Sequence, residues 1–519
     1  MNKLLKKLLF VGSIVYVGIS TIQAQAPEIQ WQKSIGGTGT DIAYSIIQTS
    51  DNGFIVAGNS SSNNGDVSGN HGLGDYLVVK LSVTGNIEWQ KSLGGTNEDD
   101  ARSIQQTLDG GYIVVGSSNS NNGDVSGNHG GADYWIVKLN SIGDIQWQKS
   151  LGGLSNEGAN SIKETEDGGY IIAGTSASTN SDVSGNHGSI DYWIVKINIE
   201  GNIEWQKSLG GSNQDNLCSI TQSFDGGYVI VGYSVSNDGD VSGNHGGVDY
   251  WIVKINSIGT IEWQKSLGGS NDDIPFSITQ TIDGGYIIAG NSSSNDGDVS
   301  GNHGYVDCWI VKINSIGIIE WQKSLGGSNQ DFVYSIIQIS DGSYIIAGNS
   351  SSNDGDVSGN HGSLDCWMVK INSSGTIIWQ KSLGGTGNDI PFSIIQTIDG
   401  GYIIAGYSDS NNGDVTGNQG YEDFLIIKLS QDNLSIDSFS NNNTISLFPN
   451  PTKESLSIKL DFYTPSQVFI ITDVLGKIIH TQKVDGLTTT IKTDGFKRGV
   501  YFLNTMDGAK MFTQRFIKI

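Results

Sequence analysis

Hydrophobic and β-branched residues occur in short runs along most of the chain, and glycine or small polar residues bound each run. Between Asp273 and Gly327 four runs follow one another: FSITQT, GYIIAGNS, DCWIVKIN and IIEWQKSLGG. Runs of this length and composition predict β-strands. The segments IIAG and WIVKI are almost continuously apolar, which favours a sheet covered on both faces.

The four runs recur along the chain with a fixed period. The tetrapeptide WQKS begins 58 residues apart at Trp31, Trp89, Trp147, Trp205, Trp263, Trp321 and Trp379. The first two runs of each copy are joined by a glycine turn such as Asp283-Gly284-Gly285, which is typical of a hairpin. Such a period predicts a propeller, a solenoid or another repeat array built from antiparallel meanders.

The two ends of the array are complementary. It begins with a fourth-strand sequence, IQWQKS at 29–34, and stops on a third-strand sequence, DFLIIKLS at 423–430. Pairing these segments would complete the last repeat and remove exposed sheet edges. We therefore predict an all-β fold, a seven-bladed β-propeller over residues 27–430 closed by its N-terminal strand. An open β-solenoid is the alternative.

Composition and net charge limit the classes of molecule that the protein is expected to bind. The chain has 72 Gly but only 6 Pro, and its net charge of −24 argues against nucleic acid or an anionic membrane surface. The three Cys form no disulfide framework, and Cys308 and Cys366 stand where other copies have Tyr.

The N-terminus has the features of a signal peptide. Lys3, Lys6 and Lys7 precede an apolar stretch, and Ala24 and Ala26 are small residues suited to cleavage. We predict a signal peptide over residues 1–24 and no transmembrane segment in the mature chain. A membrane anchor is the alternative, but the apolar stretch is short and broken by Gly and Ser.

The repeats carry a family resemblance. The run GTIEWQKSLGG at 259–269 resembles the Gly-x-x-x-Trp repeat of quinoprotein-like (PQQ-like) β-propellers, and the resemblance covers Ile29 to Leu429. It implies that this Trp docks neighbouring blades. We expect no PQQ, because the adjacent Cys pair and the single asymmetric site of the quinone dehydrogenases are not found here.

A polar linker at 431–444 leads into a second domain, residues 445–519. This tail resembles the type A C-terminal sorting domain of the type IX secretion system of Bacteroidota. The resemblance rests on Phe448-Pro449-Asn450-Pro451, on Asp473-Val474-Leu475-Gly476-Lys477, on Gly499-Val500-Tyr501 and on a terminal Lys-Ile. It implies that the type IX secretion machinery is a partner, that the tail is removed, and that the protein is secreted or held at the outer cell surface. Alternating runs such as VFIITD predict a small β-sandwich.

The longest connection of each repeat has an ordered spacing of oxygen-bearing residues. Counting Asp296 as position one, Asp298 is third, Ser300 fifth, Gly301 sixth and Asp307 twelfth, as in calcium-binding loops. The predicted ligands are Asn64, Asp66, Ser68, Asp75, Asn122, Asp124, Ser126, Asp133, Asn180, Asp182, Ser184, Asp191, Asp238, Asp240, Ser242, Asp249, Asp296, Asp298, Ser300, Asp307, Asp354, Asp356, Ser358, Asp365, Asn412, Asp414, Thr416 and Asp423. The alternative is a turn in which these side chains bond backbone amides.

Two further repeated positions have competing interpretations. Six loops carry His where the seventh carries Gln419. These residues could be ligands or glycan contacts, but the exchange for Gln favours a polar loop residue that satisfies backbone groups. The loop His residues are His71, His129, His187, His245, His303 and His361. The third-strand Trp residues (Trp135, Trp193, Trp251, Trp309 and Trp367) are predicted to lie in the core between blades and not on a sugar platform.

Repetition also bears on function. The copies differ mainly in the LGG loop, for example Asn329-Gln330-Asp331 against Asn271-Asp272-Asp273. A catalytic site needs several groups to converge at one place, whereas repeated weak sites raise avidity. We therefore predict a non-catalytic binding or adhesion module for a glycan or surface polymer, dependent on calcium if the loops bind it. The alternatives are a polysaccharide lyase or glycosidase and a purely structural surface protein.

Overall fold

The structure of the chain is a computed structural model that describes residues 25–432, 445–460, 468–473, 477–484, 486–507 and 510–519. The predicted signal peptide and almost all of the predicted linker lie outside these residues. The chain divides into two compact units, Met1–Leu434 and Ser435–Ile519. Within the described residues, no helix is long and apolar enough to span a membrane.

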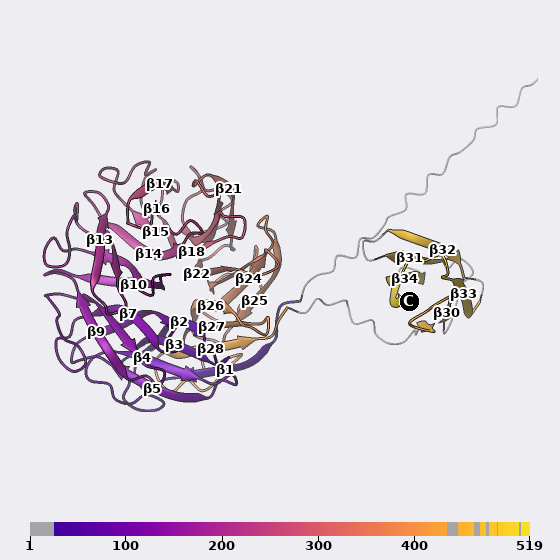
Figure 1. The fold of residues 1–519 in the computed structure, drawn as a ribbon, viewed down its shortest axis with the longest axis horizontal. Helices are drawn as coiled ribbons and strands as arrows, with labels where there is room; N and C mark the ends of the chain where they lie inside the picture. Colours follow the sequence, from indigo (N-terminus) through magenta and orange to yellow (C-terminus); the bar gives the residue numbers. More distant parts are fainter. Residues whose placement is uncertain (1–24, 433–444, 461–467, 474–476, 485, 508–509) are drawn as a thin grey trace, which may run out of the picture. The chain divides into compact units, whose positions relative to one another are not determined.

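The first unit is a ring of seven four-stranded antiparallel sheets, as predicted (Figure 1). Blade one contains β2 (Asp41–Gln48), β3 (Phe54–Ser60), β4 (Asp75–Leu81) and β5 (Ile87–Leu93), and blade two contains β6 (Asp99–Gln106), β7 (Tyr112–Ser118), β8 (Asp133–Leu139) and β9 (Ile145–Leu151). Blade three contains β10 (Glu157–Glu164), β11 (Tyr170–Ser176), β12 (Asp191–Ile197) and β13 (Ile203–Leu209), and blade four contains β14 (Asp215–Gln222), β15 (Tyr228–Ser234), β16 (Asp249–Ile255) and β17 (Ile261–Leu267). Blade five contains β18 (Asp273–Gln280), β19 (Tyr286–Ser292), β20 (Asp307–Ile313) and β21 (Ile319–Leu325), and blade six contains β22 (Asp331–Gln338), β23 (Tyr344–Ser350), β24 (Asp365–Ile371) and β25 (Ile377–Leu383).

The seventh blade is built from both ends of the array. Its strands are β26 (Asp389–Gln396), β27 (Tyr402–Ser408), β28 (Asp423–Leu429) and, as the outermost strand, β1 (Ile29–Ile35). β1 pairs antiparallel with β28, and Lys33 faces Ile426 in the register. The prediction of closure by the first segment is confirmed.

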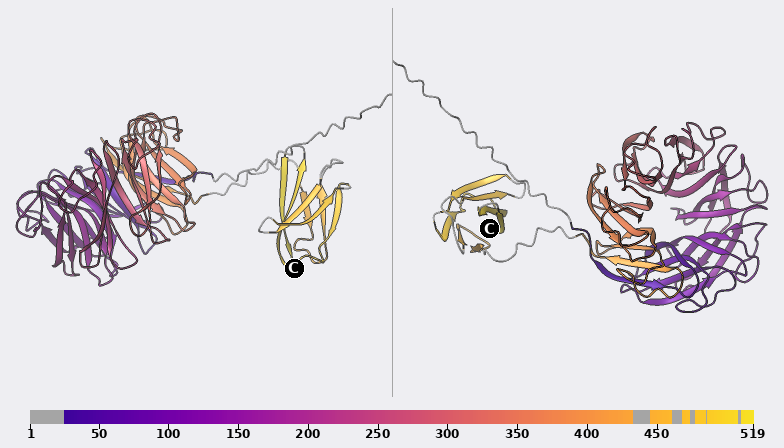
Figure 2. Two further views of the ribbon diagram at one scale, coloured as in Figure 1. Left: turned by 90° about the horizontal axis from the view of Figure 1, so that it is seen from above. Right: turned by 180° about the vertical axis from the view of Figure 1, so that it is seen from behind.

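Within each blade the order of strands runs from the axis outward. The first strands of neighbouring blades contact one another all the way round the ring, and Figure 1 shows them nearest its centre. Figure 2 shows the same ring edge-on and from behind. The second and third strands are covered on both faces by adjacent blades, which explains their continuous apolar sequences.

The cores lie between blades, not within them. Trp135 of blade two is fully buried against Tyr76 of blade one, with ring centroids 4.5 Å apart, and the Tyr76 hydroxyl donates to the Trp135 carbonyl. The equivalent Trp residues of blades three to six are buried in the same way, so their predicted place in the core is confirmed. The WQKS Trp also docks neighbouring blades: Trp89 of blade one packs on Gly143 of blade two. Cys308 and Cys366 are buried and unpaired at the Tyr positions.

A β-bulge interrupts every first strand at the same place. In blade two the register with β7 shifts between Ala101 and Ser103, which leaves Arg102 unpaired. Gly116 permits this close approach, because a Cβ there would lie 1.9 Å from the Asp100 carbonyl oxygen. The bulge residue of each blade is therefore released from the pairing of the sheet.

The second unit is a small two-sheet domain. Its strands are β29 (Ile445–Phe448), β30 (Ser455–Leu460), β31 (Val468–Asp473), β32 (Ile478–Lys483), β33 (Thr488–Lys492), β34 (Gly499–Asp507) and β35 (Lys510–Lys518). The sheets β29-β30-β33 and β32-β31-β34-β35 enclose a core that includes Leu456, Phe469 and Phe516. The predicted motif residues 474–476 lie outside the described part of the chain.

Candidate functional site

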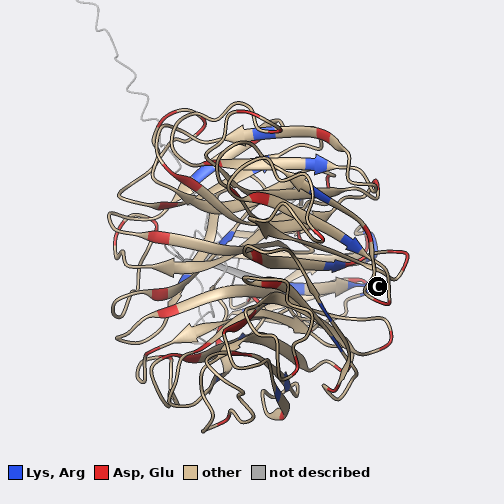
Figure 3. Cartoon of the chain, turned by 90° about the vertical axis from the view of Figure 1, so that its left-hand side faces the viewer, with Lys and Arg blue, Asp and Glu red and all other residues tan. Residues whose placement is uncertain are grey.

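The two long connections of each blade meet at one edge of the ring, as the meander predicts. The loop between β7 and β8 is bonded to the connection between β5 and β6, because the Asp124 amide donates to the Gly94 carbonyl over 2.9 Å. The glycine hairpins lie at the opposite edge, where Lys138 contacts Asp109 at 2.9 Å. Figure 3 shows acidic residues at both edges of the strands and the basic residues nearer to one of them. We call the edge with the long connections the loop edge.

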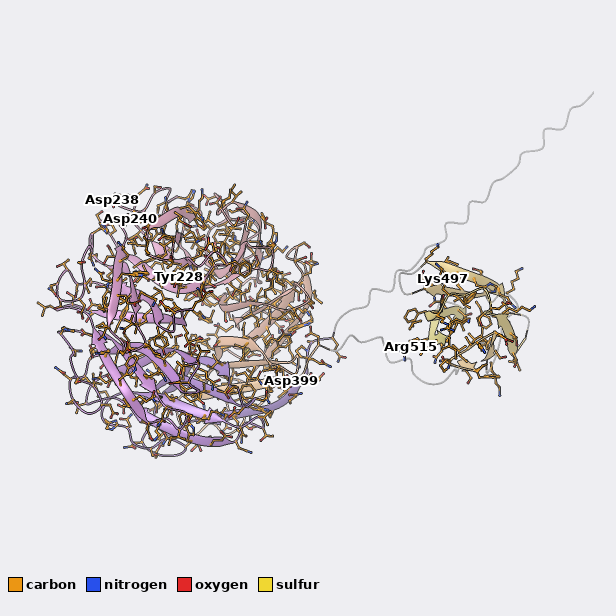
Figure 4. All side chains as sticks on the ribbon, in the orientation of Figure 1. Tyr228, Asp238, Asp240, Asp399, Lys497 and Arg515 are labelled. Carbon is orange, nitrogen blue, oxygen red and sulfur yellow. The ribbon has the colours of Figure 1, made fainter. Side chains whose placement is uncertain are left out.

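The first predicted ligand in every loop accepts a hydrogen bond from the connection that precedes its blade. Asn122 Oδ1 accepts from the Thr96 amide at 2.9 Å, and Asp238 Oδ1 accepts from the Ser212 amide at 2.8 Å. Figure 4 labels Asp238 together with Asp240, the third ligand of the same loop. The other five first ligands are placed in the same way: Asn64, Asn180, Asp296, Asp354 and Asn412.

The third and fifth predicted ligands turn towards other donors. Asp124 Oδ2 accepts from the Gly94 amide at 3.3 Å, and Ser126 Oγ accepts from Gln148 Nε2 at 2.5 Å on the fourth strand. Asp182, Asp240, Asp298, Asp356 and Asp414 repeat the first contact, whereas Asp66 accepts from Gln419. Ser68, Ser184, Ser242, Ser300, Ser358 and Thr416 repeat the second.

The twelfth predicted ligand is fully buried. Asp75 Oδ2 accepts from the His71 amide at 3.0 Å and meets His71 Nδ1 at 2.6 Å. Its Oδ1 has no hydrogen-bond partner among the described residues. The same holds for Asp133, Asp191, Asp249, Asp307, Asp365 and Asp423, except that Gln419 replaces His beside Asp423.

Electrostatics at this position follow from burial. Burial raises the pKa of the Asp75 carboxyl, and it raises that of Asp423 to about 6. The hydrogen bond with Asp75 raises the pKa of the His71 imidazole. The loop His therefore pairs with a carboxylate and not with the backbone groups that the sequence led us to expect.

The four predicted ligands of a loop thus have four different protein partners. Among the described residues no group of three or more His, Cys, Asp or Glu side chains is arranged to hold a metal ion. Spacing within the loop did not reveal the partners of the first, third and fifth ligands, since these lie in the connection that precedes the blade and in the fourth strand, whereas the twelfth ligand bonds the His of its own loop. Calcium binding by the loops remains a prediction.

The interior of the ring contains residues that sequence reasoning missed. We call the bulge residues of the seven first strands the axis residues: Tyr44, Arg102, Asn160, Cys218, Phe276, Tyr334 and Phe392. All seven axis residues are partly exposed, whereas the residue that precedes each of them along the strand is buried. The copies therefore differ in the first strand as well as in the LGG loop. An alignment of the seven first strands would have shown this difference.

Four of the axis residues are aromatic and contact one another in blade order. The ring centroids are 5.2 Å apart for Phe276 and Tyr334, 5.0 Å for Tyr334 and Phe392, and 5.0 Å for Phe392 and Tyr44. The Arg102 guanidinium continues the series, with its carbon 4.0 Å from the centre of the Tyr44 ring. Arg102 also forms an ion pair with Asp100.

Comparison with known proteins identifies the tail. Residues 446–519 match the family model described as "Secretion system C-terminal sorting domain". This match supports export by the type IX secretion system, as a secreted or cell-surface protein, and implies contact with that machinery. The resemblance of the repeats to quinoprotein-like propellers remains a prediction.

Three more distant similarities cover most of the chain. The regulatory protein FlaEY of Caulobacter vibrioides is 21% identical over 425 residues, which cover 70% of this chain and 42% of that protein. The chain therefore spans less than half of that relative. PorZ, a surface component of the type-IX secretion system of Porphyromonas gingivalis, is 12% identical, with a TM-score of 0.39 over 95% of this chain and 61% of that one. A puromycin hydrolase is 10% identical, with a TM-score of 0.44 over 85% and 62%. These likenesses are too distant to carry an argument about function.

Proposed function

We propose that the propeller is a non-catalytic binding or adhesion module that acts at the cell surface or after release. The observation that carries this proposal is the loop edge, where seven loops present closely similar exposed polar side chains in a similar hydrogen-bonded frame, with Gln419 in place of His in the seventh loop. In blade five Asn295, Asp296, Ser300 and His303 are exposed, while Asp307 beneath them is buried. Because the loops are held by internal hydrogen bonds, little conformational entropy is lost when a partner binds.

The chemistry of this edge suits a neutral glycan or a polar surface polymer. Amide, hydroxyl and carboxylate groups dominate it, and two loops add strongly exposed aromatic rings, Tyr305 and Tyr421, each 76% exposed. Tyr305 lines a shallow hollow together with Asn329, Gln330 and Ser351. An aromatic ring beside several hydrogen-bonding groups provides both the apolar and the polar contacts that an amphipathic ligand needs. Repetition of weak contacts round the edge would add avidity.

Binding of insoluble and arrayed polysaccharides by the full chain tests the proposal. Tyr305→Ser is the informative variant, because Ser189 and Ser363 occupy the equivalent positions of other blades. Phe224→Ser, which changes an exposed aromatic residue at the hairpin edge, is the matched control. We expect weaker binding for the first variant alone. Turnover of a polysaccharide would favour the lyase or glycosidase alternative, and absence of any binding would favour a structural role.

Calcium dependence is a separate part of the proposal. For a cation to bind a loop, the first and third side chains would exchange their amide donors for the metal, so binding should be weak and should stiffen the loop. A higher melting temperature of the full chain in calcium than in chelator, reduced by Asp298→Asn in proportion to the one loop of seven that it changes, is the expected result. Equal melting temperatures would contradict it.

A further inference from the structure

The inner wall of the ring breaks its sevenfold repetition. The third and fourth strands are nearly the same in every blade, and the second strands differ mainly at position six, where Tyr233 and Tyr407 replace smaller residues. The first strands differ more and read DIAYSIIQ, DDARSIQQ, EGANSIKE, DNLCSITQ, DIPFSITQ, DFVYSIIQ and DIPFSIIQ. Blade three alone has Glu at positions one and eight, and the other differences fall at positions two, three, four and seven. Three of these, positions two, four and seven, are partly exposed in most blades, so they are the positions free to meet a ligand.

The differences are sorted by blade. Blades five, six, seven and one place an apolar residue at position two and an aromatic residue at position four: Ile274 and Phe276, Phe332 and Tyr334, Ile390 and Phe392, Ile42 and Tyr44. Blades two, three and four place polar or small residues there: Asp100 and Arg102, Gly158 and Asn160, Asn216 and Cys218. One arc of the wall is therefore aromatic and the remaining arc is polar.

The polar arc contains two cations in different states. Arg102 is stacked on Tyr44 and neutralised by Asp100. Lys163, at position seven of β10, has no ion-pair or hydrogen-bond partner among the described residues, and burial lowers the pKa of its ammonium. Position seven is Ile or Thr in five blades and Gln105 in the other. A charged group that is partly withdrawn from water and unpaired is costly, and an anion would offset that cost.

We propose that the axis of the ring is a single binding site for a small amphipathic organic anion. Its apolar body lies against Phe276, Tyr334, Phe392 and Tyr44, and its anionic group meets Lys163. Position seven is three residues beyond position four, so the two contacts differ by roughly 10 Å along the strand direction. Lys163 is in blade three and the aromatic residues are in blades five, six, seven and one, so the ligand must also reach across the axis. A ring joined to a carboxylate by a flexible chain of methylene groups meets both needs. The site is independent of the loop edge, so either proposal can fail alone.

Two probes that differ only in charge test the site. The carboxylate 4-phenylbutyrate and the uncharged alcohol 4-phenylbutan-1-ol are titrated into the full chain by calorimetry. A charge-assisted contact is expected to make the carboxylate bind about tenfold more tightly than the alcohol. Equal binding of the two probes, or binding of neither, would overturn the proposal.

Variants locate the contacts. Lys163→Met should remove the preference for the carboxylate, whereas Lys207→Met, which deletes a Lys from the outer strand β13 of the same blade, should leave it. Phe392→Leu should weaken both probes equally while preserving an apolar residue at the wall. Melting temperatures show whether each variant is folded. Loss of binding in Lys207→Met, or an unchanged preference in Lys163→Met, would show that the probes bind elsewhere.

Discussion

The loop edge and the inner wall of the ring follow opposite rules. At the loop edge the seven copies keep nearly the same side chains, with Gln419 and Thr416 as the exceptions in blade seven, and each predicted ligand bonds a group of the protein itself. At the inner wall the copies differ, and the side chains that differ are partly exposed. The contrast teaches that repetition in this chain identifies what assembles the blades, while departure from repetition marks where a single ligand can be distinguished from others.

A substitution in the core between blades should have the largest effect on the free energy of unfolding. Trp135→Ala removes a fully buried ring that contacts Tyr76 and donates to Gln148, so the free energy of unfolding should fall by about 3–5 kcal/mol. Leu154→Ala, at a residue 67% exposed in the connection between blades two and three, is the control and should change it by less than about 0.5 kcal/mol. Urea denaturation measures both. Similar losses for the two variants would mean that the stability does not reside between blades.

The buried carboxyls should make the ring more stable in mild acid. Burial raises the pKa values of Asp273 and Asp423 to about 6 in the folded protein, above the ordinary 3.8. The folded state therefore holds their protons more tightly, and the stability this contributes is present below pH 3.8 and lost as the pH rises through 6. At Asp109 burial raises the pKa, but hydrogen bonds from Thr107 and Lys138 lower it to about 2, so it does not titrate in this window.

The expected size of this pH dependence follows from the raised pKa values of Asp273 and Asp423. Each shift of about two pKa units is equivalent to about 3 kcal/mol, so the unfolding free energy at pH 5 should exceed that at pH 8 by that order. Asp423→Asn should flatten the dependence. A protein that is more stable at pH 8 than at pH 5 would contradict this view of the loop edge.

Loss of a twelfth-position carboxylate should cost less than loss of a core ring. Asp133→Ala leaves the His129 amide and imidazole without their acceptor, and a buried unpaired donor costs about 1–3 kcal/mol. Asp144→Ala, in an exposed turn, is the control and should have a smaller effect. If both variants unfold at the same urea concentration, the invariant Asp does not hold the loop.

A substitution at the contact between blades seven and one should have the smallest effect on the free energy of unfolding. Gln419 donates from Nε2 to Asp66 of blade one, where the other blades place a His beside the twelfth Asp. Gln419→His exchanges this bond for the His–Asp pair, so the unfolding free energy at pH 6 should change by less than about 1 kcal/mol. A large destabilisation in urea denaturation would show that Gln419 is specific to the closing junction.

The fold could be predicted because the sequence of each propeller strand recurs in seven repeats. The offset between WQKS at Trp31 and the third-strand sequence ending at Leu429 was enough to indicate closure. The partners of Asp124 and Ser126 could not be predicted from the spacing within their loop, because Gly94 and Gln148 come from other segments. An alignment of the repeats would have shown that the axis residues differ between blades. Only the structure shows that a β-bulge at Arg102 and its equivalents leaves these residues without a partner residue on the neighbouring strand.

One double variant tests the central contrast most directly. Arg102→Tyr with Lys163→Ile gives blades two and three the residues that blades one and six carry at the same positions, Tyr44 and Tyr334, Ile47 and Ile337. We expect an unfolding free energy within about 1 kcal/mol of the original, together with loss of the preference for 4-phenylbutyrate over the alcohol. An unfolded variant, or a folded one that still prefers the carboxylate, would contradict it.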